Sequence, residues 1–333
     1  MTNKPILISG IQPTGKLHIG NYLGALKNFV ALQNSGRYQC YFFIADLHSL
    51  TEDFEPKEKP KQIYNLAFDY LSAGLDPKKS VVFIQSQIAA HTELGWILNT
   101  LTPFGELLRM TQFKEKAEAQ RKNINVGLFD YPVLQAADIL LYKAEFVPVG
   151  EDQLQHLEFT RTLARKFNNR FGKTFPEPKP LLTETPRLMS LDEPHKKMSK
   201  SRPEGCLFLD DSPQIIREKI RKAVTDSGRE IKYDLKNKPA ISNLMKIYQA
   251  TSGLPLKNIE KRYKGNGYGD FKKDLAELIV VYLSPFQERK KRLSNRPQKV
   301  QKILETGAKK ARVVAQSTMA EIRKKIGLEL STK

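Results

Sequence analysis

The sequence predicts an α/β fold in which a parallel sheet with helices on both faces is followed by a mainly helical, basic region. Over residues 1–175, short apolar runs of strand length alternate with amphipathic segments of helical period. This alternation is typical of parallel strands joined by crossover helices. Beyond Pro203, helical patterns follow one another without a strong strand pattern, so we place a domain change near residue 204.

The first expected strand, residues 5–10, leads through a glycine-rich turn, Gly10–Asn21, into an expected helix, residues 22–32. Glycines let the backbone come close to a bulky ligand, and the start of the helix favours phosphate. The spacing matches neither the dinucleotide-binding Gly-x-Gly-x-x-Gly pattern nor the P-loop. Taken alone, the stretch is also consistent with a purely structural turn.

Further strands are expected at residues 40–45 and 80–85, with helices at 57–73, 92–101 and 105–119. Asp46 and His48 directly follow the second strand. Ligands bind beyond the carboxyl ends of strands in such sheets, so both are candidates for a site. A helix cap or a turn would explain either residue equally well.

The segment Phe129–Tyr142 predicts a helix with Pro132 in its first turn. Tyr131, Gln135 and Asp138 then lie on one helical face, among apolar residues. A carboxylate in such surroundings requires a partner. The partner of Asp138 is either an arginine or lysine, in a structural pair, or the N–H of a ligand.

A short strand, residues 145–149, leads into Gly150 and an expected helix over residues 150–167. Glycine followed by acidic residues at a helix start suits contact with a ribose or an amine, and ordinary capping by Asp152 is the alternative. In the C-terminal region, Ser212 and Pro213 open a basic helix. Ser242 is expected to cap another helix, which ends at Gly253.

Composition narrows the possible partners and the compartment. The chain has 333 residues and a net charge of +19, and residues 286–333 hold fourteen Lys/Arg against four Asp/Glu. This charge favours nucleic acid, then an anionic membrane, although a lysine-rich proteome would also explain it. Two distant cysteines, Cys40 and Cys206, provide no disulfide framework and no metal-ligand spacing. With neither a membrane-spanning run nor a signal segment apparent, we expect a cytoplasmic protein without membrane attachment.

A second motif, Lys196–Ser201, lies about 180 residues downstream of the first, in a turn-rich region. Two lysines three residues apart can reach around a polyphosphate, although a solvated loop would also explain them. Together, His18-Ile-Gly-Asn21 and Lys197-Met-Ser-Lys-Ser201 resemble the paired HIGH and KMSKS motifs of class I aminoacyl-tRNA synthetases. Asn at the fourth position of the first motif is usual in the tryptophanyl branch.

The similarity to tryptophanyl-tRNA synthetases of the bacterial or organellar type covers most of the chain, in order. It is carried by five further segments: residues 110–116, 131–140, 147–153, 187–191 and 223–226. The resemblance implies a Rossmann catalytic domain at 1–203, a helical anticodon-binding domain at 204–290, and C-terminal helices, 291–333, that pack back towards the catalytic domain. It also implies a homodimer with tRNA(Trp) and L-tryptophan as partners.

The implied reaction joins L-tryptophan to ATP, with Mg²⁺, and then to the terminal adenosine of the tRNA. A carboxylate nucleophile is already ionised at pH 7, so the site needs no general base. By resemblance, the catalytic lysines are Lys116, Lys197 and Lys200, and no protein-held metal is expected. The implied ATP-binding residues are Gln12, Pro13, Thr14, His18, Gly20, Asn21, Gly150, Glu151, Asp152, Leu188, Lys197, Met198, Ser199, Lys200 and Ser201.

The resemblance also assigns specificity to Asp138, as the acceptor of the indole N–H. The other residues of the implied tryptophan pocket are Ile8, Ser9, His48, Tyr131, Gln135, Val147, Val149 and Gln153.

Two positions depart from the family pattern. Gln135 stands where many tryptophanyl enzymes carry Met, and with Tyr131 and Asp138 it is similar to the tyrosyl pocket, so tyrosine is the alternative substrate. Arg202 follows the second motif where Asp is usual, which leaves the capping of that loop open.

Two other classes of function remain as alternatives. A catalytically silent RNA-binding paralogue would keep the basic helices and lose the motif lysines, which this chain retains. A small-molecule adenylyltransferase would not need the roughly 130-residue helical, basic C-terminal region.

Overall fold

The chain folds around a five-stranded parallel sheet. The structure, a computed structural model, describes residues 4–111, 124–182, 188–200 and 202–329. The strand order is β3-β2-β1-β4-β5, and every neighbouring pair is parallel. The strands are β1 (Ile6–Ile11), β2 (Gln39–Ile44), β3 (Ser80–Ile84), β4 (Phe146–Val149) and β5 (Lys179–Leu182). The predicted α/β class with a parallel sheet is therefore confirmed.

Alternate residues of the central strands face two separate hydrophobic cores. Phe42 and Ile44 of β2 belong to one core with α2 (Lys27–Asn34) and α3 (Lys59–Ala73). Tyr41 and Phe43 face the other core. That second core is built with α4 (Ala90–Asn99), α7 (Val126–Leu140) and α8 (Leu154–Phe171). Both faces are buried, which is why the strands read as continuous apolar runs.

Short helical segments stand between the main elements. The first helix is divided into α1 (Ile19–Asn21), a π-helical turn η1 (Tyr22–Leu26) and α2. Others are η2 (His48–Thr51), η3 (Pro56–Glu58), η4 (Gln85–Gln87), α5 (Phe104–Leu108) and η5 (Glu151–Gln153). Three of them, η2, η4 and η5, begin within four residues of the carboxyl end of a strand.

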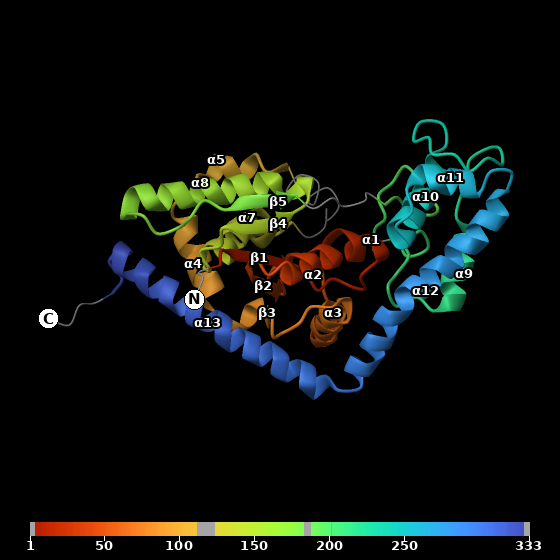
Figure 1. Cartoon of the computed structure of the whole chain (residues 1–333). Helices are drawn as coiled ribbons and strands as arrows, with labels where there is room; N and C mark the ends of the chain where they lie inside the picture. Colours follow the sequence, from red (N-terminus) through yellow and green to blue (C-terminus); the bar gives the residue numbers. More distant parts are fainter. Residues whose placement is uncertain (1–3, 112–123, 183–187, 201, 330–333) are drawn as a thin grey trace.

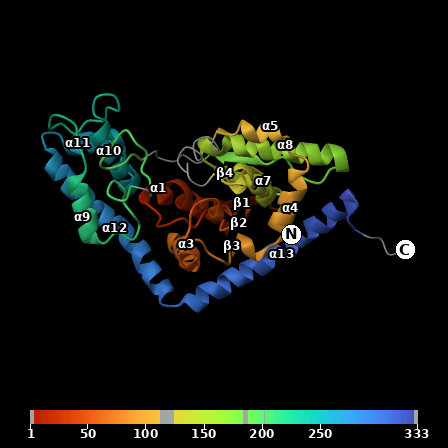
Figure 2. The same ribbon diagram turned by 180° about the vertical axis from the view of Figure 1, so that it is seen from behind.

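The C-terminal region is helical, as predicted. It contains α9 (Pro213–Lys222), α10 (Pro239–Ser252), α11 (Leu256–Arg262), α12 (Tyr268–Ser294) and α13 (Pro297–Ile326). Figure 1 shows α9, α10 and α11 grouped at one end of the molecule, with α12 leading away from them and α13 returning beneath the sheet. Figure 2 shows the same arrangement from behind.

Helix α13 covers the outer edge of strand β3. Ala308, Ala311 and Ala315 on its buried face belong to the same core as Val81 and Phe83. At Gly307 the two backbones nearly touch, because a Cβ added there would lie 1.8 Å from the carbonyl oxygen of Val82. A helix laid this closely against an edge strand shields its unpaired backbone groups. No helix in the described ranges is long and apolar enough to cross a membrane.

Three local predictions were wrong, and one strand was missed. Helix α7 begins at Val126, because the side chain of Asn125 accepts a hydrogen bond from Leu128 N, and Pro132 therefore lies inside the helix. Ser242 lies within α10, where its hydroxyl accepts a hydrogen bond from Asp234 N. Helix α5 ends at Leu108, so the helix expected over residues 105–119 does not run on from its start, and residues 112–119 of that expectation lie outside the described residues. Strand β5 was not predicted, because Lys179–Leu182 is too short and half-exposed to stand out.

Candidate active site

The order of the strands marks one position along the sheet, between the carboxyl ends of β1 and β4, as the expected place of a ligand site. The chain connects β1 to β2 on one side, and β4 to β5 on the other, so the direction of winding reverses between β1 and β4. Ligands bind at such a reversal in open α/β sheets. The loop after β1, residues 12–18, and the segment η5 after β4 lie on its two sides. These segments contain six of the fifteen predicted ATP-binding residues.

The glycine-rich turn ends in a reciprocal cap made by His18 and Asn21. The Nδ1 atom of His18 accepts a hydrogen bond from Asn21 N at 3.3 Å, and Oδ1 of Asn21 accepts one from His18 N at 3.2 Å. The His18 ring lies close above Gly20, where an added Cβ would come within 2.9 Å of the ring. Asn at the fourth position of the motif is thus half of the cap, and Gly20 makes room for the imidazole.

His18 is uncharged at neutral pH. Burial, together with the nearby charges of Lys200 and Lys197, lowers the pKa of His18 to about 4. Since Nδ1 accepts a hydrogen bond, the neutral ring carries its proton on Nε2. The imidazole therefore offers an uncharged N–H donor beside two lysines.

The lysine motif folds onto the glycine-rich turn, although 186 residues separate the contacting groups. Lys200 Nζ donates a hydrogen bond to the carbonyl oxygen of Thr14 at 2.6 Å. The chain after the motif pairs with the turn through two backbone bonds, Ile19 N to Leu207 O at 2.8 Å and Leu209 N to Leu17 O at 3.0 Å. The structure thus brings the two motifs of the sequence analysis together.

The lysine motif itself is a short hairpin. Met198 N donates to the carbonyl oxygen of Leu188 at 3.0 Å, and Ser190 N donates to Lys196 O at 2.8 Å. The Met198 side chain is buried, while Lys197 is exposed. Arg202, at the position where the family usually has Asp, forms an ion pair with Glu193 of the same hairpin. This ion pair links the two sides of the loop, so Arg202 has a partner within the loop although the usual Asp is missing.

Lys200 is the partly buried lysine of the motif. Burial lowers the pKa of its ammonium group, while the carboxylates of Asp69 and Glu52 oppose that shift. A cation that is partly removed from water interacts more strongly with a nearby anion than an exposed one does. This environment suits a group that must neutralise phosphate charge.

Asp138 on α7 is 1 % exposed and accepts hydrogen bonds on both carboxylate oxygens. Oδ2 lies 2.7 Å from His48 Nε2, and Oδ1 lies 2.7 Å from His91 Nδ1. Gln85 Nε2 donates to Oδ1 at 2.7 Å. Burial alone would raise the pKa of this carboxyl, but His48 and His91 outweigh burial and lower it. The partners of Asp138 are thus imidazoles and an amide, neither the arginine nor the lysine considered above.

The other residues of the predicted amino-acid pocket come from five elements, which are α7, η2, β1, β4 and η5. Tyr131 is buried about two turns before Asp138 on α7, and its hydroxyl lies 2.8 Å from His156 Nε2 of α8. The rings of Tyr131 and His48 meet edge to face at 6.3 Å. Ser9 Oγ donates to the carbonyl oxygen of Pro148 at 3.4 Å, which joins β1 to β4. Ile8, Val147 and Val149 are buried in the same core as Tyr131's neighbours on α7, and Gln135 and Gln153 are half-buried.

The remaining predicted ATP residues that the structure describes lie in the turn after β1, at η5 and in the lysine hairpin. Thr14 N donates to Gln12 O at 2.9 Å within the turn, and Pro13 is buried between them. Gly150 precedes η5, in which Glu151 and Asp152 are exposed, and Gln153 Nε2 donates to Asp152 Oδ2 at 3.0 Å. Ser199 is half-buried in the lysine hairpin. Lys116 and Ser201 lie outside the described residues.

Three polar residues of this site were missed in the sequence. Gln85 directly follows β3, so the rule about carboxyl ends of strands would have found it. His91 on α4 lies 47 residues from Asp138 and His156 lies 25 from Tyr131, and no spacing in the sequence indicates either contact. These contacts depend on how α4, α7 and α8 pack.

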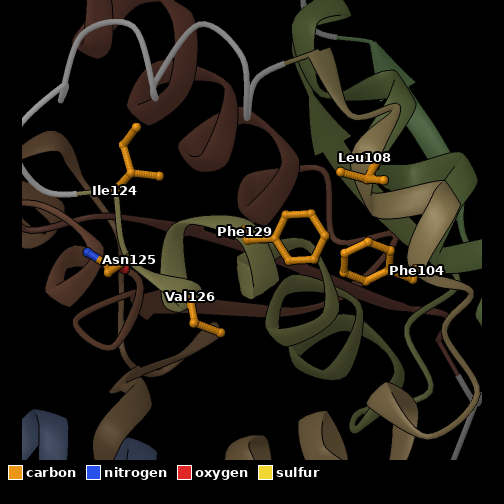
Figure 3. Close-up of a pocket in the computed structure, with 6 residues that line it drawn as sticks. All are labelled: Phe104, Leu108, Ile124, Asn125, Val126 and Phe129. Atoms are coloured by element: carbon orange, nitrogen blue, oxygen red, sulfur yellow. The ribbon is translucent and has the colours of Figure 1, made fainter.

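An apolar hollow of about 310 Å³ lies at the start of α7, away from these contacts. Figure 3 shows its lining: Phe104, Leu108, Ile124, Asn125, Val126 and Phe129. Phe104 and Val126 are 68 % and 80 % exposed, respectively. A patch of large apolar side chains open to solvent is typical of an interaction surface.

Comparisons with known proteins agree with this geometry. Residues 1–284 match the family described as tRNA synthetases class I (W and Y). A tryptophan–tRNA ligase of Caldanaerobacter subterraneus subsp. tengcongensis is 50 % identical over 327 residues, which are 97 % of this chain and 98 % of that protein. The crystal structure of tryptophanyl-tRNA synthetase from Mycoplasma pneumoniae has a TM-score of 0.88 at 36 % identity, covering 98 % of both chains.

A second solved structure, tryptophanyl-tRNA synthetase from Campylobacter jejuni complexed with ADP and tryptophan, has a TM-score of 0.84 at 38 % identity. The match covers 96 % of this chain and 99 % of that one. On the family match and on relatives that are similar over nearly the whole length, the chain belongs to the class I tRNA synthetases of the W and Y family, in its tryptophanyl branch.

Proposed function

We propose that this chain is a tryptophan–tRNA ligase that converts L-tryptophan and ATP to tryptophanyl-adenylate and pyrophosphate, and then transfers tryptophan to the 3′-terminal adenosine of tRNA(Trp). The observation that carries the proposal is the contact of the two motifs at the carboxyl end of β1, where Lys200 Nζ donates to Thr14 O at 2.6 Å. Relatives of this name at 46–50 % identity over nearly the whole chain support the same activity.

The first step forms one bond and breaks one. An oxygen of the tryptophan α-carboxylate attacks the α-phosphorus of ATP, and the bond to the bridging oxygen breaks as pyrophosphate leaves. Lys197 and Lys200 neutralise the charge on the departing phosphates, together with Lys116. His18 is a neutral hydrogen-bond donor at the base of the turn, and Gly20 leaves room for its imidazole ring. In the second step a ribose hydroxyl of the tRNA attacks the activated carbonyl, and AMP leaves.

Mg²⁺ enters this proposal bound to ATP. The side chains that the proposal places at the phosphates are lysines, which cannot bind a metal ion, and Mg²⁺ commonly binds through substrate phosphates and water. Adenosine would lie against Gln12 and Pro13 on one side and Gly150, Glu151 and Asp152 on the other. The backbone at Leu188 would complete this part of the site, next to Met198 and Ser199.

Asp138 is proposed to accept the indole N–H of tryptophan. Its buried carboxylate is an acceptor only, so a side chain without a donor would leave it unpaired at a cost. Tyr131, Gln135 and His48 would line the tryptophan pocket beside Asp138. Its apolar walls would be Ile8, Val147 and Val149, with Ser9 and Gln153 at the edge.

Tyrosine is the alternative substrate, because Tyr131, Gln135 and Asp138 share one face of α7. The deciding experiment is exchange of labelled pyrophosphate into ATP, with tryptophan and tyrosine tested in parallel. Exchange with tryptophan alone is expected. Exchange with tyrosine alone would overturn the specificity, and exchange with neither would favour an RNA-binding paralogue.

The helical region, residues 204–290, is proposed to read the anticodon of the tRNA, with residues 291–333 packing back on the catalytic domain at 1–203. The net charge of +19 supports a polyanionic partner. A stoichiometric complex with tRNA(Trp) whose affinity falls steeply with salt is expected, whereas a small-molecule adenylyltransferase would form none. A cytoplasmic location is proposed, because it fits the tRNA substrate and the two free, buried cysteines, Cys40 and Cys206.

We also propose that the enzyme is a homodimer, as its family implies. The exposed apolar hollow formed by α5 and the start of α7 supports this, because such a patch is unfavourable in water unless covered. Light scattering after size-exclusion chromatography should give twice the chain mass of 38.0 kDa. Phe104→Asp together with Val126→Asp should shift the mass towards that of one chain.

A further inference from the structure

The carboxylate of Asp138 is held by a network of buried side chains that the reaction described above does not use. Gln85 of η4, His91 of α4 and Tyr142, just after α7, are all fully buried. Gln85 and His91 each contact Oδ1 at 2.7 Å. The other ring nitrogen of His91, Nε2, lies 2.9 Å from the hydroxyl of Tyr142.

The direction of each hydrogen bond in this network follows from the chemistry of its members. An ionised carboxylate only accepts, so Nδ1 of His91 donates to Asp138. In a neutral imidazole the second nitrogen is then an acceptor, and Tyr142 donates its hydroxyl proton to it. The Gln85 amide is fixed at both ends, because its Oε1 accepts from Leu47 N at 3.1 Å while its Nε2 faces Asp138.

Among the residues that the structure describes, the partners of Asp138 leave one acceptor position open. A carboxylate has about four lone-pair positions. Gln85 and His91 occupy both positions of Oδ1, and His48 occupies one position of Oδ2. The remaining position belongs to the oxygen beside His48, whose ring also meets the ring of Tyr131.

We propose that Gln85, His91 and Tyr142 are positioning residues for amino-acid selection, which saturate Oδ1 of Asp138 and so present a single acceptor on Oδ2 to the side chain of the substrate. The inference rests on the proposed activation of tryptophan. A fixed acceptor with one vacancy favours a ring with one N–H, and rejects a ring of the same shape that lacks it. When the carboxylate is free to turn, it can bond to other groups, and that rejection weakens.

The test compares tryptophan with β-(3-benzothienyl)alanine, in which sulfur replaces the indole N–H. Pyrophosphate exchange gives kcat/KM for each amino acid, and the ratio of the two values measures recognition of the N–H group. For His91→Leu we expect the ratio to fall about tenfold or more, since the loss of one buried hydrogen bond typically has such an effect. His91→Asn keeps a donor near the Nδ1 position and should restore part of the ratio. The KM for ATP should not change.

Tyr142→Phe is the milder variant, because it removes only the hydroxyl that orients His91. We expect the ratio to fall about threefold to tenfold, by the same reasoning. Tyr70→Phe is the matched control: Tyr70 is also fully buried, and its hydroxyl donates to the carbonyl oxygen of Phe43 at 2.9 Å, outside this network. The control should keep the ratio of the unaltered enzyme.

Two results would overturn the inference while leaving the proposed function intact. One is an unchanged ratio in both His91→Leu and Tyr142→Phe, and the other is an equal fall in the Tyr70→Phe control. If His91→Leu does not fold, Tyr142→Phe and its control decide. An unaltered enzyme that shows no exchange with tryptophan would instead refute the proposed function, and this inference with it.

Discussion

At the scale of single residues, His18 is the clearest case of a side chain whose charge is set by its surroundings. It is buried in the turn after β1, and the positive charges of Lys200 and Lys197 lie close to it. Both effects disfavour the imidazolium. The folded chain therefore resists taking up a proton that the unfolded chain binds readily.

This property predicts an acid-sensitive contribution to stability. Because the pKa of His18 falls from 6.5 to about 4 on folding, the unfolded chain binds more protons between these values. The contribution is present above pH 6.5 and is lost as the pH falls towards 4. From pH 7.5 to pH 5, the unaltered protein should lose about 2 kcal/mol more than His18→Asn, as measured by urea unfolding. His195→Asn, at an exposed position, should behave like the unaltered protein.

A second prediction at this scale concerns Lys200. If its ammonium group neutralises charge that develops as pyrophosphate leaves, Lys200→Met should lower kcat about a hundredfold and change the KM for ATP little. Steady-state exchange kinetics measure both constants. Lys196→Met is the control, since Lys196 is an exposed residue of the same hairpin and pairs with Glu193. Equal losses in ATP affinity and rate for Lys200→Met would contradict this role.

How far the sequence could predict the site depends on the origin of each contact. Helical spacing placed Tyr131, Gln135 and Asp138 on one face of α7, and the end of β2 indicated His48. Those are local properties. His91 reaches Asp138 only because α4 packs beside α7, and no local pattern contains that information.

At the scale of elements, α12 is tied to the sheet domain by an ion cluster. Lys290 of α12 lies 2.6 Å from Asp69 Oδ1 of α3 and 2.8 Å from Asp210 Oδ2, in the chain that leads into α9. The neighbouring Arg289 donates from Nε to the carbonyl oxygen of Ser72 at 2.6 Å. One turn of α12 therefore contacts both α3 and the segment that leads from the lysine hairpin into α9.

This cluster predicts a pH-dependent effect of Lys290→Met. Burial raises the pKa of Asp69 to about 6, with Lys290 opposing the rise, so removal of the lysine leaves a buried carboxylate without its cation. The expected loss is about 3 kcal/mol at pH 7.5 by urea unfolding. The folded chain then binds more protons than the unfolded chain at mildly acidic pH, so the loss should be smaller at pH 5.

The control for this prediction is Lys291→Met, at the adjacent exposed position, which should change stability little at either pH. A loss of stability in Lys290→Met that does not depend on pH would show that Asp69 stays charged without its partner.

At the scale of the whole molecule, α13 brings the C-terminal part of the chain back against strand β3 of the sheet. Gly307 of this helix lies directly against the backbone of β3. In an ordinary helix interior, Gly→Ala stabilises by up to about 1 kcal/mol. Here the added Cβ would overlap Val82 O, so Gly307→Ala should instead destabilise by about 1 to 3 kcal/mol, as overpacked sites do.

Thermal unfolding measures this change, with Ser317→Ala on the exposed side of α13 as the control, which should be neutral or slightly stabilising. A gain in stability for Gly307→Ala would mean that α13 moves away from β3 at little cost.

The overall plan was predictable because it is repeated along the chain. Each buried strand is an apolar run in the sequence, and each helix shows the helical period of apolar residues. The α/β class and the helical C-terminal region were therefore predictable, and both are confirmed. The start of α7 was missed, because Asn125 caps it seven residues before the proline that marks the expected start. The brief strand β5 was missed because pairing with β4, rather than its own sequence, makes it a strand.

The contact of α13 with β3 also has a consequence for synthesis on the ribosome. Strand β3 ends at Ile84, but the helix that covers its edge ends at Ile326. About 240 residues are made in between, which takes roughly 12 to 50 s at ordinary rates of translation. During that time the nascent sheet carries an open edge at β3, which is available for pairing with other chains until α13 emerges.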